Sequence, residues 1–338
     1  MLISVIIPAY NARKFIGSML DSLVAQHFKD MEVVIADDCS PEAYDDVIEQ
    51  YESRLNIVRT KTAYNCCPGN TRQAGYDASH GEWVMFGDQD DRFAPDAIKK
   101  MAAHIRKNPE AVVIFSDFDE VSEEGEVLRH HSSPAGWTHG KAFKREWWES
   151  HHLKYKKDLK SHEDIYLSSL VTCCLQEDKL EPSYLPATTY LWTQRKGSLT
   201  HCEKELFIEN HMEEYIQATG WVYLLYWKNC KEESKFFAKW HAIGVILYIY
   251  FYHMGVIFRN ADGFRKEMTP AIMQFIQTLK RELEMTNDDL LLFMAQDRGR
   301  YYWKHLEMAT IATGPYIPCM TIQRYLEVMA PEEIDATK

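Results

Sequence analysis

Apolar residues in the first 120 positions alternate between the spacing of strands and that of helices. Residues 3–8 are an almost unbroken apolar run, as a parallel strand buried on both faces requires. Residues 13–26 instead repeat apolar side chains at helical spacing. The alternation continues, with further strands predicted at residues 33–36, 55–59, 83–86 and 112–118 and further helices at residues 41–51, 69–79 and 95–107. It predicts an α/β fold of the doubly wound type, with a mostly parallel sheet and helices on both faces.

Local signals mark the ends of two of these helices. Ser40 is a favoured N-cap residue, and Pro41 after it suits the first position of a helix. Gly81 suits the left-handed conformation that often closes a helix. These signals place the start of one helix at residue 41 and the end of another before residue 81.

The pattern changes in the second half of the chain. From residue 120 to about residue 200 the alternation becomes irregular, and from Glu205 onward the sequence is helical and rich in aromatic residues. A chain of 338 residues can hold one domain with a substantial appendage. We therefore predict an α/β domain at residues 1–204 and a helical region at residues 205–338.

One apolar segment raises the question of a membrane. Residues 240–258 contain no Asp, Glu, Lys or Arg and could just span a bilayer, but they include two histidines and three tyrosines. We predict a buried core helix there, with a peripheral membrane contact and a true span as the alternatives. No signal peptide precedes the first strand, so we expect a cytoplasmic protein, with attachment to the inner face of the cell membrane as the alternative.

Charge and cysteine content narrow the function. The formal charge of −12 argues against a nucleic-acid partner and means that an anionic substrate needs a metal or local arginines. The eight cysteines include no CxxC pair, so a zinc or redox site is not indicated, and we read them as reduced thiols.

The strongest chemical signal is an acidic cluster directly after the strand at residues 83–86. Asp88, Asp90 and Asp91 repel one another, and a cation would relieve the repulsion. Carboxylate oxygens suit Mg²⁺ or Mn²⁺, which keep positions open for a phosphate. The alternative is a polar turn that caps the next helix. Polar groups also follow the first two strands, at residues 9–11 and 37–38, and the ends of parallel strands share one rim.

These motifs, in this order, resemble the family 2 glycosyltransferases, inverting enzymes of the GT-A fold that use nucleotide-diphosphate sugars. The resemblance covers about residues 1–200, with Cys39 where glycine is common. The motifs are SVIIPAYN at residues 4–11, VIADDCS at 34–40, NTRQAG at 70–75, GEW at 81–83 and DQD at 88–90.

The resemblance implies a donor site. Asp38 would accept a hydrogen bond from a uracil-like base, and Arg72 would reach the base or the diphosphate. The alternative for Asp37 and Asp38 is a helix-capping turn. The implied donor-binding residues are Pro8, Ala9, Tyr10, Asn11, Asp37, Asp38, Arg72, Asp88, Gln89 and Arg195.

The resemblance also implies a divalent cation, Mn²⁺ or Mg²⁺, that bridges the two phosphates. Asp90 would be its main ligand, with Asp88 beside it and His201 completing the shell, whereas a structural role is the alternative for His201. Arg195 would stabilise the departing nucleotide.

An acidic pair at the start of the helical run 165–175 would supply the general base. Inversion needs one carboxylate to deprotonate the acceptor hydroxyl, and the resemblance assigns this to Asp164, with Glu163 beside it. The alternative is that the pair only complements the helix dipole. His139 and Lys141 lie in a segment that resembles one beside the donor sugar and acceptor, or else form a solvated basic turn.

We therefore expect a metal-dependent inverting glycosyltransferase of cell-surface polysaccharide synthesis. Its donor would be a nucleotide sugar, most simply a UDP-sugar, and its acceptor a glycan or lipid-linked glycan. A nucleotidyltransferase is the rival enzyme, although residues 8–11 contain no glycine, and a non-catalytic sugar-nucleotide-binding protein is the other rival. The aromatic residues of the helical region suit a sugar face, a homodimer contact or an ordinary core.

Overall fold

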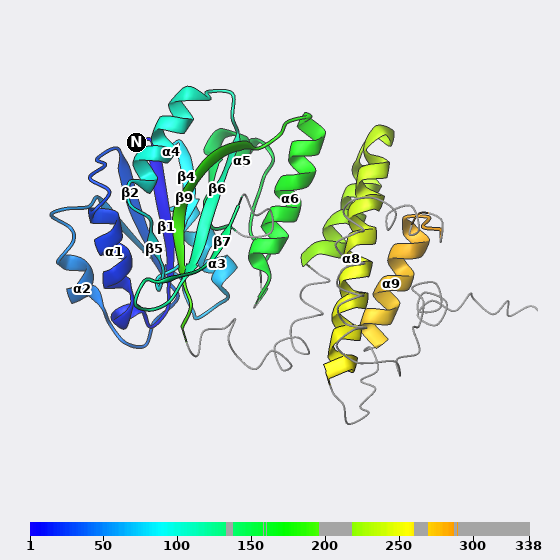
Figure 1. Ribbon diagram of the computed structural model, residues 1–338, viewed down its shortest axis with the longest axis horizontal. Helices are drawn as coiled ribbons and strands as arrows, with labels where there is room; N and C mark the ends of the chain where they lie inside the picture. The colour runs from blue at the N-terminus through cyan, green and yellow to red at the C-terminus, as the bar shows by residue number, and fades with distance from the viewer. Residues whose placement is uncertain are drawn as a thin grey trace, which may run out of the picture. The chain divides into compact units, whose positions relative to one another are not determined.

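The computed structural model describes residues 1–132, 138–157, 159, 161–195, 218–259, 270–286 and 289 (Figure 1). The chain divides into two compact units, Met1–Lys204 and Glu205–Lys338. The candidate ligand His201 lies outside the described residues, as do residues 205–217, 260–269, 287–288 and 290–338 of the predicted helical region.

The first unit is built on one sheet, which confirms the predicted α/β class. In the described residues the strand order is β3-β2-β1-β4-β8-β6-β9-β5, and β7 pairs with β6. The strands are β1 (Ile3–Ala9), β2 (Met31–Asp37), β3 (Ile57–Lys61), β4 (Trp83–Phe86), β5 (Arg92–Phe93), β6 (Val113–Val121), β7 (Val127–His131), β8 (Lys141–Lys144) and β9 (Ser183–Thr193). The helices are the 3₁₀ turn η1 (Ala12–Lys14), α1 (Ile16–Val24), α2 (Asp45–Glu49), α3 (Pro68–Asp77), α4 (Ala97–Lys107), α5 (Arg145–Ser150) and α6 (Glu163–Asp178).

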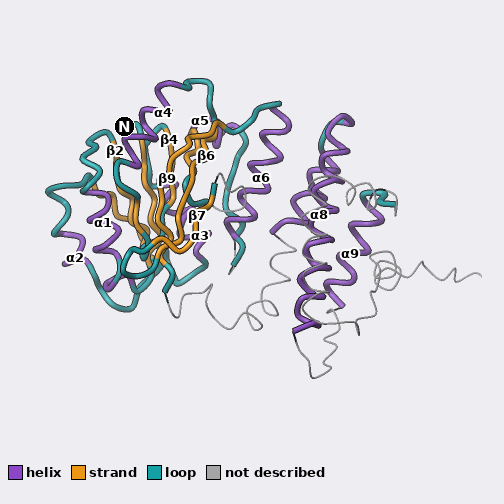
Figure 2. The backbone as a smooth tube through the Cα atoms, in the orientation of Figure 1, coloured by secondary structure: helices purple, strands orange, loops and turns teal. Residues whose placement is uncertain are grey.

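Strand β1 shows why the apolar run at the start of the chain needs cover on both faces. Its neighbours β2 and β4 both run parallel to it. Because successive side chains of a strand point to opposite faces, Val5 and Ile7 enter one apolar cluster with Met19 of α1, while Ile6 enters a second with Trp148 of α5. Both faces of the parallel part are therefore buried under helices (Figure 2).

The described residues between 120 and 195 are more regular than we expected. They contain β7, β8, α5, α6 and β9, and β8 lies antiparallel between β4 and β6. Strand β9 runs parallel to β6 with register shifts between Ser116 and Phe118. Buried and exposed side chains do not alternate regularly along β9. The sequence of this strand therefore lacks the apolar–polar alternation by which a strand is usually predicted.

One expected helix start and one expected helix cap were wrong. Helix α2 begins at Asp45 rather than at residue 41, and the Ser40 hydroxyl accepts a hydrogen bond from the Asn11 N–H instead of capping a helix. Gly81 does not adopt a positive φ. Instead its N–H donates to the Ser4 hydroxyl at 2.7 Å, and an added Cβ would lie 2.5 Å from the Ser4 nitrogen. Close approach to β1, not a left-handed turn, is what requires glycine here.

The second unit is helical where it is described. It contains a helix at residues 218–229, α8 (Glu232–Arg259) and α9 (Pro270–Glu282). Gly220 packs so tightly on Phe275 of α9 that it leaves no room for a Cβ. Ala242 and Ile243 of α8 are buried. Among the described helices, none combines the length and apolar character that a membrane crossing requires, so the span considered for residues 240–258 is not supported.

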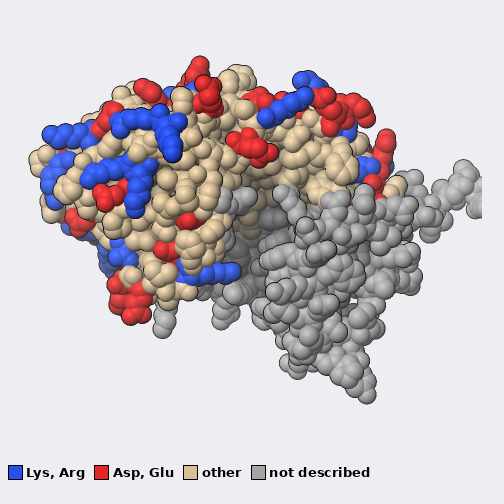
Figure 3. Space-filling model, turned by 45° about the horizontal axis from the view of Figure 1, so that its top comes forward, with Lys and Arg blue, Asp and Glu red and all other residues tan. Residues whose placement is uncertain are grey.

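The charged side chains of the described surface are mixed in sign. Figure 3 shows Lys and Arg interspersed with Asp and Glu around the visible face of the first unit. The net negative charge is thus spread over this face rather than gathered in one acidic field.

Candidate donor and catalytic site

The predicted polar rim forms where the parallel strands end. Ala9 at the end of β1 pairs with Asp37 at the end of β2, and β4 ends beside them. The loops after β1 and β4 are joined by two reciprocal hydrogen bonds: the Tyr10 N–H donates to Gln89 Oε1 at 2.8 Å, and Gln89 Nε2 donates to the Tyr10 carbonyl at 2.9 Å. The Tyr10 ring is left exposed beside this junction.

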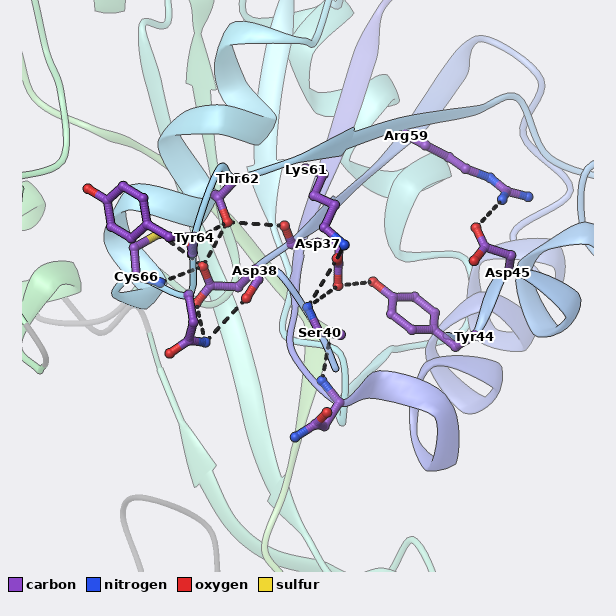
Figure 4. Close-up of polar contacts among 12 residues, drawn as sticks. Asp37, Asp38, Ser40, Tyr44, Asp45, Arg59, Lys61, Thr62, Tyr64 and Cys66 are labelled. Atoms are coloured by element: carbon purple, nitrogen blue, oxygen red, sulfur yellow. Dashed lines mark hydrogen bonds and ion pairs between the residues drawn. The ribbon is translucent and has the colours of Figure 1, made fainter. Parts of the chain in front are cut away.

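Asp38 is held at the rim by the segment that follows β3 (Figure 4). Its own N–H donates to the Ala9 carbonyl at 2.7 Å, which ties it to β1. Its carboxylate accepts hydrogen bonds from Thr62, Asn65 and Cys66. The candidate base-reading carboxylate is therefore buried and oriented by the protein itself.

Asp37 has a different set of partners. Its carboxylate accepts hydrogen bonds from the Ser40 N–H and, at 3.0 Å, from the Tyr44 hydroxyl, and it pairs with Lys61 at 3.2 Å. These contacts lower the pKa of Asp37 despite the opposing effect of burial. Asp37 thus stabilises the turn after β2, although that turn does not cap a helix, because α2 begins at Asp45.

Pro8 and Asn11 frame the same rim through the backbone. Pro8 is partly buried in β1 opposite Ala36. Asn11 adopts a left-handed conformation with φ 49°, and its N–H donates to the Ser40 hydroxyl at 3.0 Å. The turn after β1 is therefore fixed to the turn after β2.

Arg72 lies between two carboxylates, and its reach to the base or the diphosphate stays a prediction. Its guanidinium is only 7% exposed and bonds Asp88 at 2.6 Å and Glu163 at 2.5 Å. Burial alone would raise the pKa of Asp88, but Arg72 and His139 hold it well below its usual range. The end of β4 and the start of α6 thus share one buried cation.

A second network joins Asp88 to Asp91 through strand β9. The Tyr190 hydroxyl accepts from the Asp88 N–H at 2.7 Å and donates to Asp91 at 2.8 Å. Burial, with Asp88 and Asp90 nearby, raises the pKa of Asp91 well above its usual range. The His139 ring stacks on Tyr190 with centroids 4.8 Å apart. Tyr190 was not predicted from the sequence, because nothing local marks a residue so far along the chain as a partner of the acidic cluster.

Three residues can hold a cation together. Ligand atoms of Asp88, Asp91 and His139 all lie within 4.8 Å of one another. Two carboxylates and an imidazole fit Mn²⁺, and a cation would favour the ionised form of Asp91. Asp90, the ligand implied by the resemblance, instead pairs with Arg195, whose guanidinium carbon lies 4.4 Å from the centre of the Phe15 ring.

Asp164 lies in the first turn of α6, directly after Glu163. One of its carboxylate oxygens accepts from the Ile165 N–H at 2.7 Å. Burial and the neighbouring Glu163 raise the pKa of Asp164 to about 6. A carboxylate with this pKa is ionised at neutral pH and a better proton acceptor than an ordinary aspartate.

Lys141 of β8 is buried beside α6. Its ammonium lies 3.5 Å from the Ser168 hydroxyl and 4.6 Å from the centre of the Phe115 ring. Burial lowers the pKa of Lys141 to about 7. The solvated basic turn considered for this segment is therefore wrong for Lys141, and its contact with an acceptor stays a prediction.

The sequence of this chain is similar to those of known proteins. The family model described as Glycosyl transferase family 2 matches residues 4–167. An uncharacterized glycosyltransferase of Haemophilus influenzae is 35% identical over 115 residues, which cover 34% of this chain and 38% of that protein. The poly(ribitol-phosphate) β-N-acetylglucosaminyltransferase TarS of Staphylococcus aureus is 35% identical over 118 residues, 34% of this chain and 21% of TarS. The matched segments thus span well under half the length of these two relatives.

Solved structures extend the similarity in fold over most of the chain. TarS residues 1–349 in complex with UDP-GlcNAc superpose with a TM-score of 0.66 at 20% identity, covering 91% of this chain and 89% of that one. A Pyrobaculum calidifontis mannosyltransferase in complex with GDP-Man and Mn²⁺ gives 0.51 at 14% identity, covering 91% and 83%. They confirm the predicted GT-A-type fold with a helical C-terminal region. Residues 4–167 are therefore a domain of the glycosyl transferase family 2 type.

Proposed function

We propose that the protein is an inverting glycosyltransferase that moves a sugar from a UDP-sugar to a hydroxyl of a glycan or lipid-linked acceptor in cell-surface polysaccharide synthesis. One observation carries the proposal. The buried guanidinium of Arg72 bonds both Asp88, at the end of β4, and Glu163, the neighbour of Asp164. A carboxylate suited to the donor side and one suited to proton abstraction therefore meet at one place.

Asp164 would act as the general base. As the acceptor oxygen attacks the anomeric carbon, its proton passes to the Asp164 carboxylate, and the bond from that carbon to the diphosphate oxygen breaks. A single displacement inverts the configuration and needs no carboxylate nucleophile. The raised pKa of Asp164 supports this role, because the group is basic enough to accept the proton yet ionised at neutral pH.

The leaving diphosphate needs positive charge. A divalent cation held by Asp88, Asp91 and His139 would neutralise it. Arg195, two residues after the end of β9, would place a second positive group near the diphosphate. The assignment of Asp90 and His201 as ligands stays a prediction, and the acidic chain makes some such compensation necessary.

Uracil is the base that we propose for the donor nucleotide. Asp38 supplies a carboxylate acceptor, and Ala9 and the exposed Tyr10 lie next to it on the rim. TarS, which shares the fold, was crystallised with UDP-GlcNAc and with UDP. The mannosyltransferase of the same fold was captured with GDP-Man, so guanine is the alternative base.

For the helical region we propose a role on the acceptor side or in a homodimer contact. Three large apolar side chains of its described part are exposed: Trp221, Leu225 and Phe236. Aromatic rings bury much area at little entropic cost, which suits both roles. Light scattering of the full chain would test the dimer.

A panel of UDP-, GDP- and CDP-sugars with Mn²⁺ tests the function. We expect a UDP-sugar to raise the melting temperature and to be slowly hydrolysed without acceptor. Binding without any turnover, with or without candidate glycans, would favour the non-catalytic rival. Release of pyrophosphate from a nucleoside triphosphate would favour the nucleotidyltransferase.

A further inference from the structure

Two adjacent carboxylates at the end of β2 face separate partners (Figure 4). The Asp37 carboxylate contacts Ser40 and Tyr44, which follow β2 in the chain, and Lys61 of β3. Asp38 faces the segment that leaves β3, residues 62–66. Each carboxylate thus has its own set of partners, and the Asp38 N–H also donates to the Ala9 carbonyl at the end of β1.

The two oxygens of Asp38 are unequally occupied. Oδ1 accepts hydrogen bonds from the Cys66 N–H at 2.8 Å and the Cys66 thiol at 2.9 Å. The Thr62 hydroxyl lies 3.0 Å from Oδ1 and 2.9 Å from the Tyr64 carbonyl, so its single proton is shared between these two acceptors. Oδ2 accepts one long bond, from Asn65 at 3.3 Å. A carboxylate has about four lone-pair positions, two on each oxygen. Oδ1 is therefore saturated, whereas Oδ2 has a lone pair left that can accept from another donor.

The Cys66 thiol is suited to this holding role. Burial and the adjacent carboxylate raise the pKa of Cys66, so the sulfur keeps its proton and donates it. The sulfur also lies 3.6 Å from the Thr71 hydroxyl of α3. Asp38 is thereby linked to both β3 and α3.

We propose that Thr62 and Cys66 are positioning residues for base selection: they fix Oδ1 of Asp38, so that Oδ2 stays aimed at a ring N–H of the nucleotide base. The inference rests on the proposed function, since it takes a nucleotide sugar as the donor. It assigns the selectivity to the two residues that hold the carboxylate as well as to the carboxylate itself.

The chemistry of the bases explains why a fixed carboxylate selects. Uracil presents a ring N–H at N3, which a carboxylate accepts. Cytosine presents a lone pair at N3 and an amino group one position away. A carboxylate that cannot turn meets the cytosine lone pair and repels it, whereas one that can turn reaches the amino group. Removing a hydrogen-bond donor that fixes the Asp38 carboxylate should therefore lower the preference for UDP over CDP.

The test uses the full chain with Mn²⁺ and compares dissociation constants for UDP and CDP by calorimetry. Thr62→Val and Cys66→Ala each remove one side-chain donor, and we expect each to lower the UDP/CDP preference by about fivefold, the effect of one net hydrogen bond. Thr62→Ser and Cys66→Ser keep a donor and should restore most of the preference. Cys67→Ala is the matched control and should leave it unchanged.

The outcomes separate the inference from the proposed function. If the wild-type protein binds UDP but the preference is the same in Thr62→Val and Cys66→Ala, the inference is overturned and the proposed function stands. If the wild-type protein binds UDP and CDP equally, the inference is likewise overturned. If it binds no nucleotide, both are wrong. A loss of preference in the alanine and valine variants, with recovery in the serine variants, supports a positioning role that a purely structural contact would not show.

Discussion

Arg72 and Glu163 form an ion pair across 91 positions of the chain, with the guanidinium 2.5 Å from the carboxylate. Helix α3 supplies the arginine, and the first turn of α6 supplies the glutamate next to Asp164. The other end of the same guanidinium holds Asp88. The ion pair therefore connects Asp88, on the proposed donor side, with the helix turn that carries Asp164, the proposed general base.

Replacing Arg72 with Gln should destabilise the protein by about 3–5 kcal/mol, because two carboxylates would lose the buried cation that compensates them. Arg59→Gln is the control: Arg59 also bridges two carboxylates, Asp45 and Glu52, but on the surface. It should change stability by at most about 1 kcal/mol. Urea denaturation of both variants measures the difference, and equal effects would contradict the role of burial.

Asp164→Asn should abolish transfer while leaving donor affinity unchanged. Removal of a general base typically lowers a rate by about 10²–10⁴. The base touches the acceptor and not the nucleotide, so the dissociation constant for UDP measured by calorimetry should stay within about twofold. A parallel loss of affinity and rate would place Asp164 in the donor site instead.

The rate of transfer should depend on pH through the same residue. The pKa of Asp164 is raised to about 6, and only the ionised carboxylate can accept a proton. Transfer should therefore be constant above about pH 7 and fall tenfold per pH unit well below pH 6. Measuring kcat from pH 4.5 to 8.5 tests this. An acid limb centred near pH 4, the ordinary range of an aspartate, would contradict it.

Mn²⁺ should raise the melting temperature in the presence of UDP, and the variants identify its ligands. If Asp88, Asp91 and His139 hold the ion, then Asp91→Asn and His139→Ala should lose the Mn²⁺-dependent shift. The resemblance instead predicts that Asp90→Ala loses it. Thermal melts with and without Mn²⁺ distinguish the two assignments, and a shift that survives all three substitutions contradicts both.

Two glycines should respond in opposite ways to alanine. An added Cβ at Gly81 would lie 2.5 Å from the backbone nitrogen of Ser4, so Gly81→Ala should cost about 1–3 kcal/mol. At Gly17, within α1, the Cβ would meet only the Tyr51 hydroxyl at 3.5 Å. Gly17→Ala should stabilise the protein by up to about 1 kcal/mol through helix propensity. Thermal or urea unfolding of the two variants measures whether each substitution lowers or raises the stability of the protein.

The sequence predicted the parallel half of the sheet because its signals are local. The apolar run of β1 and the acidic cluster after β4 can be seen within a few residues. The antiparallel strand β8 could not be predicted, since it pairs with β4 across about sixty residues and carries no alternation of its own. Long-range pairings are decided by packing of the whole sheet rather than by local preference.

The site, like the sheet, combines residues that local sequence signals predict with residues that only long-range contacts place. The positions of Asp38 and Asp88 at strand ends followed from the order of the elements. The burial of Arg72 did not, because its environment depends on α6, far along the chain. Tyr190 was missed for a similar reason: its bond to Asp91 spans 99 positions. Side-chain identity predicted the chemistry, but the partner of each group depended on tertiary contacts.

The three carboxylates after β4 each depend on a different part of the fold. Asp88 is bonded by Arg72 of α3, Asp91 by Tyr190 of β9, and Asp90 by Arg195 beyond the end of that strand. A substitution of Arg72 or Arg195 therefore reaches one carboxylate of the cluster, whereas a substitution of Tyr190 reaches both Asp91 and the Asp88 N–H. The charge around Asp88 and the charge around Asp90 can thus be changed separately, but Asp91 cannot be changed through Tyr190 without disturbing Asp88.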